Sequence, residues 1–187
     1  CKLDADKTAV VLGCGMEGLL TVAALKTLGI NKIIVIDKES EKSRAMEFGA
    51  WEFIGSHGKN GVAGVQDKIR AAAGDMADAV FICTDSPMGR NVARRFMKNS
   101  GSICEMGFLC GWRRTPTARY FEDRLPAGGS FYAARDYENC MNFLAKAAEM
   151  KLPLYKLITH RYKLEEINEA MWTVVREEGL GIAVFNR

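Results

Sequence analysis

The stretch TAVVLGCGMEGLL, residues 8–20, decides the fold of this chain. Its first five residues are β-branched or apolar and predict a buried strand. The next six, Gly13-Cys14-Gly15-Met16-Glu17-Gly18, match the pattern G-x-G-x-x-G, and an apolar helix is expected from Met16 to Leu28. A glycine turn between a strand and a helix is the arrangement that binds the pyrophosphate of a dinucleotide.

Each glycine of this turn has a separate predicted role. Gly13 permits the tight turn, Gly15 lets the backbone approach a pyrophosphate, and Gly18 lets the helix pack against its strand. The N–H groups and the positive end of the helix would then face the phosphates. The carboxylate of Glu17 opposes this binding unless it points outward, which a helix N-terminus favours.

A second buried strand, KIIVI at residues 32–36, ends at Asp37. A carboxylate at this place can accept hydrogen bonds from both hydroxyls of an adenosine ribose, and it would repel a 2′-phosphate. We therefore expect NAD as the cofactor rather than NADP. The alternative is that the glycine motif forms a turn in some other α/β fold.

Apolar strands and helices alternate along the rest of the chain. This alternation implies right-handed β-α-β crossovers and a parallel sheet with helices on both faces. We predict an α/β fold in which residues 1–135 form a Rossmann domain, a doubly wound parallel sheet of six strands. The further strands are expected at 51–54, 79–83, 102–106 and 130–133, and the further helices at 38–48, 65–73, 88–98 and 136–150.

Composition excludes several classes of partner. The 187 residues include 26 Lys and Arg against 23 Asp and Glu, so the net charge is only +3. This balance excludes a strongly basic nucleic-acid arm and an acidic disordered tail. No apolar stretch reaches the ~18 residues that span a membrane, and nothing at the start signals secretion. We expect a cytoplasmic protein that binds neither nucleic acid nor membrane.

The cysteines predict no metal site. They form no C-x-x-C pair, and the two histidines, His57 and His160, lie far apart in the chain. Structural zinc sites need short cysteine clusters, so reduced, buried cysteines are expected instead. The six cysteines are Cys1, Cys14, Cys83, Cys104, Cys110 and Cys140.

Two stretches resemble the zinc-type medium-chain dehydrogenases, the alcohol and polyol dehydrogenase family. Residues 8–50 are similar to that family's cofactor domain, and LITHRYKLEEINEAM at 157–171 resembles its C-terminal stretch. The resemblance implies an enzyme of the EC 1.1.1 type that transfers a hydride between an alcohol or polyol and NAD. It also implies that the partner is a small-molecule alcohol.

The resemblance extends the expected cofactor site. It implies that Asp37 holds the adenosine ribose with help from Lys42, that Thr84 lines the path to the nicotinamide ribose, and that Gly107 and Phe108 lie beside the nicotinamide ring. The alternatives are a solvated charge for Lys42 and turn or core positions for Thr84 and Phe108. The expected cofactor-binding residues are Gly13, Gly15, Met16, Glu17, Gly18, Asp37, Lys38, Lys42, Thr84, Gly107 and Phe108.

The family's catalytic elements do not occur in this sequence. A zinc-binding Cys beside Ser or Thr, a Gly-His-Glu motif and a four-cysteine lobe are all missing. We therefore expect a C-terminal fragment, inactive by itself, with no catalytic or metal-binding residue, and zinc only in the intact enzyme. Residues 136–187 would be the return segment of the absent GroES-like catalytic domain. His160 is then structural, and Ala183 replaces a basic residue that often touches the cofactor.

Other interpretations remain open. The chain could be a non-catalytic nucleotide-binding or assembly module, or part of a zinc-free medium-chain reductase.

The predicted strand Ser130–Ala133 would form a sheet edge, and because edges invite pairing we expect a homodimer through it. The pairs Arg94-Arg95 and Arg113-Arg114 are expected to be a solvated helix face and a loop. In Lys163–Val175 the apolar stripe Leu164, Ile167, Met171 and Val174 predicts a core or domain contact.

Overall fold

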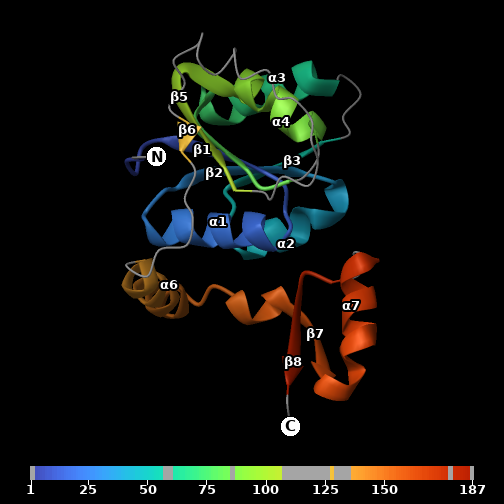
Figure 1. Cartoon of the computed structure of the whole chain (residues 1–187). Coiled ribbons are helices and arrows are strands. Elements are labelled where there is room, and N and C mark those ends of the chain that lie inside the picture. The colour runs from blue at the N-terminus through green and yellow to red at the C-terminus, as the bar shows by residue number, and fades with distance from the viewer. Residues whose placement is uncertain are drawn as a thin grey trace. The chain divides into compact units, whose positions relative to one another are not determined.

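The computed structural model describes residues 3–56, 61–84, 87–106, 127–128, 136–176 and 179–185. The chain forms two compact units, residues 1–152 and residues 153–187 (Figure 1). The sequence boundary proposed between residues 135 and 136 stays a prediction. None of the helices in the described residues combines the length and the apolar composition of a membrane span.

The first unit is built on a parallel sheet with the strand order β3-β2-β1-β4-β5-β6. Every neighbouring pair is parallel, as the alternation of strands and helices predicts. The order reverses between β1 and β4, which is where open α/β sheets place their ligands. The strands are β1 Thr8–Leu12, β2 Lys32–Asp37, β3 Glu52–Gly55, β4 Ala77–Ile82, β5 Met97–Glu105 and β6 Ala127–Gly128. The strand expected at Ser130–Ala133 lies outside the described residues.

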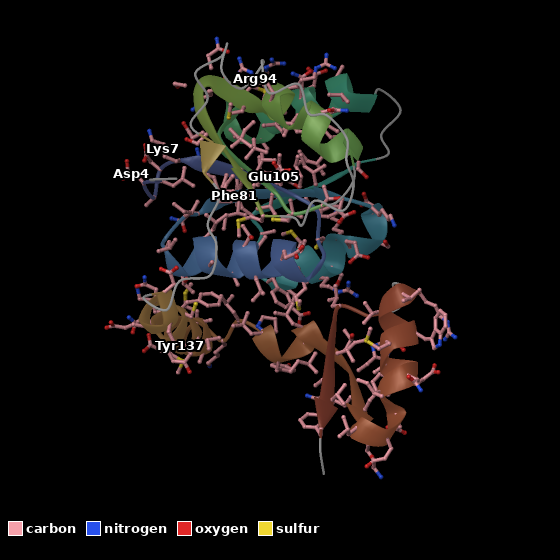
Figure 2. All side chains as sticks on the ribbon, viewed as in Figure 1. Asp4, Lys7, Phe81, Arg94, Glu105 and Tyr137 are labelled. Carbon is pink, nitrogen blue, oxygen red and sulfur yellow. The ribbon has the colours of Figure 1, made fainter. Side chains whose placement is uncertain are left out.

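Helices cover both faces of this sheet. α1 (Met16–Thr27) and α2 (Lys42–Glu47) lie on one face, and α3 (Gly61–Ala73) and α4 (Pro87–Ala93) lie on the other (Figure 1). α6 (Tyr137–Glu149) contacts α1. Tyr137 lies on the side of α6 away from α1 (Figure 2), and 73% of it is exposed.

The helix expected at 88–98 ends earlier than predicted. It breaks into α4 and a 3₁₀ turn, Arg94–Phe96, and β5 then begins at Met97 instead of Ser102. Phe96 and Met97 are both buried. A Cβ added at Gly101 would collide with the Met97 side chain. Packing of Phe96 and Met97 in the folded chain therefore ends the helix earlier than the helical pattern of the sequence predicts.

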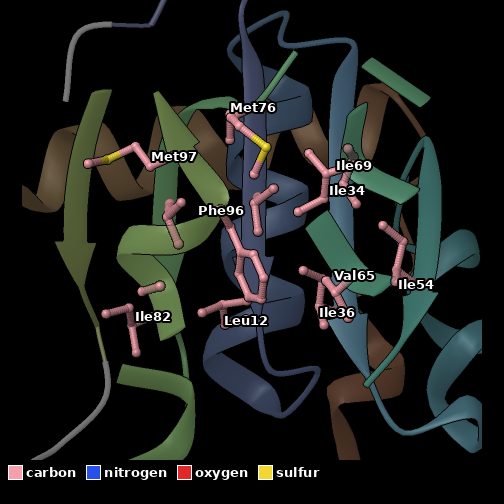
Figure 3. Close-up of a cluster of buried hydrophobic side chains, with 14 of the residues drawn as sticks. Leu12, Ile34, Ile36, Ile54, Val65, Ile69, Met76, Ile82, Phe96 and Met97 are labelled. Carbon is pink, nitrogen blue, oxygen red and sulfur yellow. The ribbon is translucent and has the colours of Figure 1, made fainter. Parts of the chain in front are cut away.

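The core between the sheet and the α3–α4 face is continuous and apolar. Strand residues such as Leu12, Ile34 and Ile82 meet Val65 of α3 and Phe96 of the 3₁₀ turn (Figure 3). These side chains alternate along strands that carry few polar residues, as expected for a sheet covered on both faces. This core supports the loops at the carboxyl ends of the strands.

The carboxylate of Asp78 ties the amino ends of three strands together. The backbone N–H of Thr8 in β1 donates to Asp78 Oδ2 in β4 at 2.9 Å, and Lys98 Nζ in β5 lies 2.9 Å from Asp78 Oδ1. Burial acts to raise the pKa of Asp78. These two hydrogen bonds and the charges of Lys98 and Lys7 outweigh burial and lower that pKa below 3.8.

The second unit is a parallel pair of strands with one helix. β7 (Ile158–Lys163) pairs with β8 (Gly181–Phe185), and α7 (Ile167–Val175) follows a 3₁₀ turn after β7. The hydroxyls of Tyr162 and Thr173 lie 2.8 Å apart and join β7 to α7. The ring of His160 stacks on Tyr162 and its Nδ1 lies 3.0 Å from Thr159 Oγ1, which supports a structural role for this histidine.

The predicted apolar stripe of this unit is not buried within it. α7 buries Ala170 and Thr173. The four stripe residues are between 40% and 59% exposed, namely Leu164, Ile167, Met171 and Val174. None of the four stripe residues is therefore fully buried, and a contact of the stripe with a further domain stays a prediction.

Candidate functional site

A pocket of about 450 Å³ opens at the carboxyl ends of the strands in the first unit. It lies at the reversal of strand order, between the ends of β1, β2, β3 and β4 and the helices α3 and α4. Its walls combine an apolar surface with a few polar groups, as is usual for small-molecule sites. The lining residues are Leu12, Gly13, Ile36, Asp37, Lys38, Ser56, Gly61, Val62, Val65, Thr84, Gly89, Val92 and Phe96.

The glycine turn at the edge of this pocket has the geometry that its sequence predicts. Gly13 has a φ of +100°, a left-handed conformation that side chains rarely adopt. A Cβ added at Gly13 would collide with the Cys83 carbonyl oxygen, and one at Gly18 would collide with the Gly13 carbonyl oxygen. A Cβ at Gly15 would instead enter open space. The first and third glycines are thus required by the fold, and Gly15 leaves room for a ligand.

The carboxylate of Asp37 is held by two backbone donors. Cys14 N–H donates to Oδ2 and Lys38 N–H donates to Oδ1, each at 2.6 Å. The first bond joins the glycine turn to the end of β2. Each carboxylate oxygen keeps a second lone pair, so Asp37 can still accept hydrogen bonds from a ligand hydroxyl.

Burial favours the protonated form of the thiols near the turn. Burial, reinforced by the negative charges of Asp37 and Glu41 and opposed by Arg44, raises the pKa of Cys14 to about 12. Burial likewise raises the pKa of Cys83 to about 11. Both stay protonated at neutral pH, whereas a thiolate is needed for nucleophilic attack or metal binding.

The prediction of buried cysteines holds only in part. Cys14 and Cys83 are buried, Cys104 is partly exposed, and Cys140 is exposed on α6, where the prediction is wrong. Cys140 lies on the solvent-facing side of the amphipathic helix α6. Cys1 and Cys110 lie outside the described residues.

The other predicted site residues divide into three groups. Lys38 and Thr84 line the pocket with Gly13 and Asp37. Gly107 and Phe108 lie outside the described residues. The remaining five residues do not line the pocket. Gly15 lies in the glycine turn, and Met16, Glu17 and Gly18 lie in the first turn of helix α1. Lys42 lies in α2, where its Nζ is 3.9 Å from Glu39 Oε1.

Sequence reasoning missed the wall formed by α3 and α4. One side of the pocket is closed by Val62 and Val65 of α3, Val92 of α4 and Phe96 of the 3₁₀ turn after α4. Gly89 allows α4 to approach Thr84, because a Cβ there would lie 2.6 Å from Thr84 Cγ2. Helical spacing of Val62, Val65 and Ile69 marks an inward face, but it does not separate pocket positions from core positions.

Among the residues that the structure describes, no group of three or more His, Cys, Asp or Glu side chains is placed to hold a metal ion.

The basic residues of the first unit include a group around a shallow, polar depression, formed by Arg70, Arg94, Arg95 and Lys98. Lys98 is paired there with Asp75 and Asp78. Arg113 and Arg114 lie outside the described residues.

Comparison with known proteins shows the family to which the chain belongs. Residues 18–146 match the family model for zinc-binding dehydrogenases. The chain is 29% identical over 169 residues to sorbitol dehydrogenase 1 of Saccharomyces cerevisiae, covering 86% of this chain and 46% of that protein. The chain spans about half the length of the curated relatives it matches.

Solved structures share the fold. An alcohol dehydrogenase from Thermotoga maritima superposes with a TM-score of 0.83 at 23% identity, covering 97% of this chain and 50% of that chain. The NADH complex of an Escherichia coli short chain alcohol dehydrogenase superposes with a TM-score of 0.71 at 20% identity, covering 96% of this chain and 52% of that chain.

Proposed function

The chain belongs to the zinc-binding dehydrogenase family, and from that premise we propose that its first unit binds NAD for an oxidoreductase that acts on an alcohol or polyol. The observation that carries this proposal is the Asp37 carboxylate, fixed by the glycine turn at the edge of the pocket. The names of the relatives, which include sorbitol and alcohol dehydrogenases, support the class of substrate.

The residues present fit a dinucleotide. Gly15 leaves open space where a pyrophosphate would approach the N–H groups that begin α1. Asp37 would accept hydrogen bonds from the ribose hydroxyls, and the apolar wall of Val62 and Val65 would pack against the adenine ring. When bound, the cofactor supplies the hydride chemistry at its nicotinamide ring. This chain would hold and orient the cofactor.

NAD is proposed over NADP for an electrostatic reason. A 2′-phosphate carries close to two negative charges at neutral pH and would lie beside the Asp37 carboxylate. Because both oxygens of that carboxylate are held by backbone N–H groups, it cannot turn away without losing a hydrogen bond. NADP would therefore bind more weakly than NAD.

Catalysis is proposed to lie in another part of the intact protein. The described residues do not fit a zinc site. The exposed apolar stripe of the second unit, centred on Met171 and Val174, offers a surface for a further domain. We propose that such a GroES-like domain brings the zinc and most of the substrate pocket, with residues 136–187 as its return segment. A homodimer through the sheet edge and a cytoplasmic location remain predictions.

Titration calorimetry of the folded chain with NAD tests this function. We expect saturable one-site binding, and Asp37→Gly should weaken NAD much more than NADP. Asp67→Asn controls for the loss of a negative charge elsewhere on the first unit, since Asp67 is an exposed carboxylate on α3 with only a 3.7 Å contact to Arg70. No heat of binding at millimolar NAD, or equal losses for both cofactors in Asp37→Gly, would overturn the proposal.

A further inference from the structure

Two glutamates of the turn between β2 and α2 pair with the two cations of α2. The 3₁₀ turn Glu39–Glu41 links β2 to α2. Lys42 Nζ lies 3.9 Å from Glu39 Oε1, and Arg44 Nη1 lies 2.7 Å from Glu41 Oε2. Each cation is thus paired with an acidic side chain three residues before it, a spacing that brings side chains together on one helical face.

The Glu39 carboxylate lies at the carboxyl edge of the sheet, beside the pocket. A Cβ added at Gly55 would lie 2.6 Å from Glu39 Oε2, so this oxygen sits directly over the last residue of β3. Gly55 is the register partner of Asp37 in β2, and Ser56 lines the pocket. Glu39 therefore places a second negative charge close to Asp37, on the side toward β3.

We infer that Glu39 is a second determinant of cofactor choice, which excludes a 2′-phosphate together with Asp37; this inference rests on the proposed function. Glu39 acts in two ways. Its charge repels a phosphate at the 2′ position, and its ion pair neutralises Lys42. Lys42 would otherwise be a cation available to that phosphate.

The competing charges do not remove this effect. Lys38 also lines the pocket, but its charge is the same in the wild type and in every Glu39 variant, so it does not alter the comparison between them. Arg44 is bound to Glu41 at a shorter distance than Lys42 is to Glu39, so it is less readily released. Lys42 is therefore the cation that the loss of Glu39 would free.

The expected effect is modest because the pair is exposed. The side chains of Lys42 and Glu39 are 55% and 72% accessible, so water and salt screen their charges. Removing one charge beside a phosphate dianion should change affinity about three- to tenfold at low ionic strength.

Equilibrium titration of the full chain with NAD and NADP tests this inference. Glu39→Gln should tighten NADP binding about three- to tenfold and change NAD binding less than about twofold, and the gain should shrink near 1 M salt, where charges are strongly screened. Glu47→Gln is the matched control, because it removes the same charge from the other end of α2. Adding Lys42→Gln to Glu39→Gln should remove part of the gain.

The outcomes separate the inference from the proposed function. If wild type binds NAD and Glu39→Gln leaves NADP binding unchanged, or Glu47→Gln gives an equal gain, the role of Glu39 is wrong. If the folded wild type binds neither cofactor, the proposed function fails, and the inference fails with it. Thermal unfolding of each variant confirms that it is folded.

Discussion

The backbone N–H of Cys14 donates a 2.6 Å hydrogen bond to Oδ2 of Asp37. This bond joins the turn after β1 to the end of β2. The segment that would bind the pyrophosphate is therefore fixed to the segment that would bind the ribose. An acceptor fixed before binding loses little freedom when a ligand arrives. The glycines that shape the turn therefore matter in two separable ways, for the fold and for the ligand.

Gly15→Val should weaken NAD binding more than it weakens the fold. The added side chain enters open space, but Val is a poorer N-cap for α1 than Gly, so the free energy of unfolding should fall by no more than about 1 kcal/mol. The same side chain would block a pyrophosphate, and the NAD dissociation constant should rise at least about tenfold. Calorimetry and urea unfolding measure the two effects. Unchanged NAD affinity would contradict the placement of the pyrophosphate.

Gly13→Ala should show the reverse order of effects. Its φ of +100° and the nearby Cys83 carbonyl oxygen leave no room for a Cβ. We expect a loss of about 1–3 kcal/mol in the free energy of unfolding, from backbone strain and collision. Urea unfolding without any ligand measures this loss. A stability equal to that of Gly15→Val would show that the turn has another conformation.

Gly89→Ala should displace Thr84 and weaken NAD binding. The new methyl group would lie 2.6 Å from Thr84 Cγ2, and both residues line the pocket. Thr84→Ser removes that methyl group, so the double variant should recover most of the affinity. The cycle of four titrations yields a coupling free energy for the two positions. Additive effects in this cycle would exclude the contact as the cause.

Glu17→Gln should strengthen NAD binding. The first turn of α1, which contains Glu17, would face the pyrophosphate, and loss of a negative charge there should tighten binding about threefold at low salt. Helix α1 should lose about 0.3–1 kcal/mol, because acidic side chains stabilise a helix N-terminus. An affinity unchanged at low salt would show that this carboxylate points away from the phosphates.

Asp78→Asn should destabilise the first unit in a pH-dependent way. The lowered pKa of Asp78 means that its ionised form stabilises the fold at all pH values well above 3.8, and this stability is lost as the pH falls through the folded value. At pH 7 the variant should lose about 1–2 kcal/mol. Urea unfolding should show a smaller difference near pH 3. Equal losses at pH 7 and pH 3 would contradict the ionised contacts with Thr8 and Lys98.

The sequence predicted the first half of the sheet closely. β1 is Thr8–Leu12 as expected, α1 ends one residue early at Thr27, and β2 extends one residue to Asp37. These segments are strongly patterned and separated by glycines, so local signals decide them. After Thr84 the predictions were poorer, since the turn at Phe96 and Met97 depends on packing between distant segments.

The site was predictable only where a residue has one physical role. Gly13, Gly18 and Asp37 follow from turn geometry and from position at a strand end. Val62, Val92 and Gly89 belong to helices whose inward faces also fill the core, so their place at the pocket emerges only from the folded arrangement. The ion pair that holds Lys42 depends on Glu39, which sequence spacing alone did not single out.

Amide chemical shifts of the ¹⁵N-labelled chain during addition of NAD test the central claim most directly. The claim predicts saturable shifts gathered at the pocket, above all at the Cys14 and Lys38 amides that hold Asp37, and at Ser56 and Thr84. Amides at the opposite end of the sheet, such as Lys98, should not move. No shift at millimolar NAD, or shifts centred on that opposite end, would contradict the account.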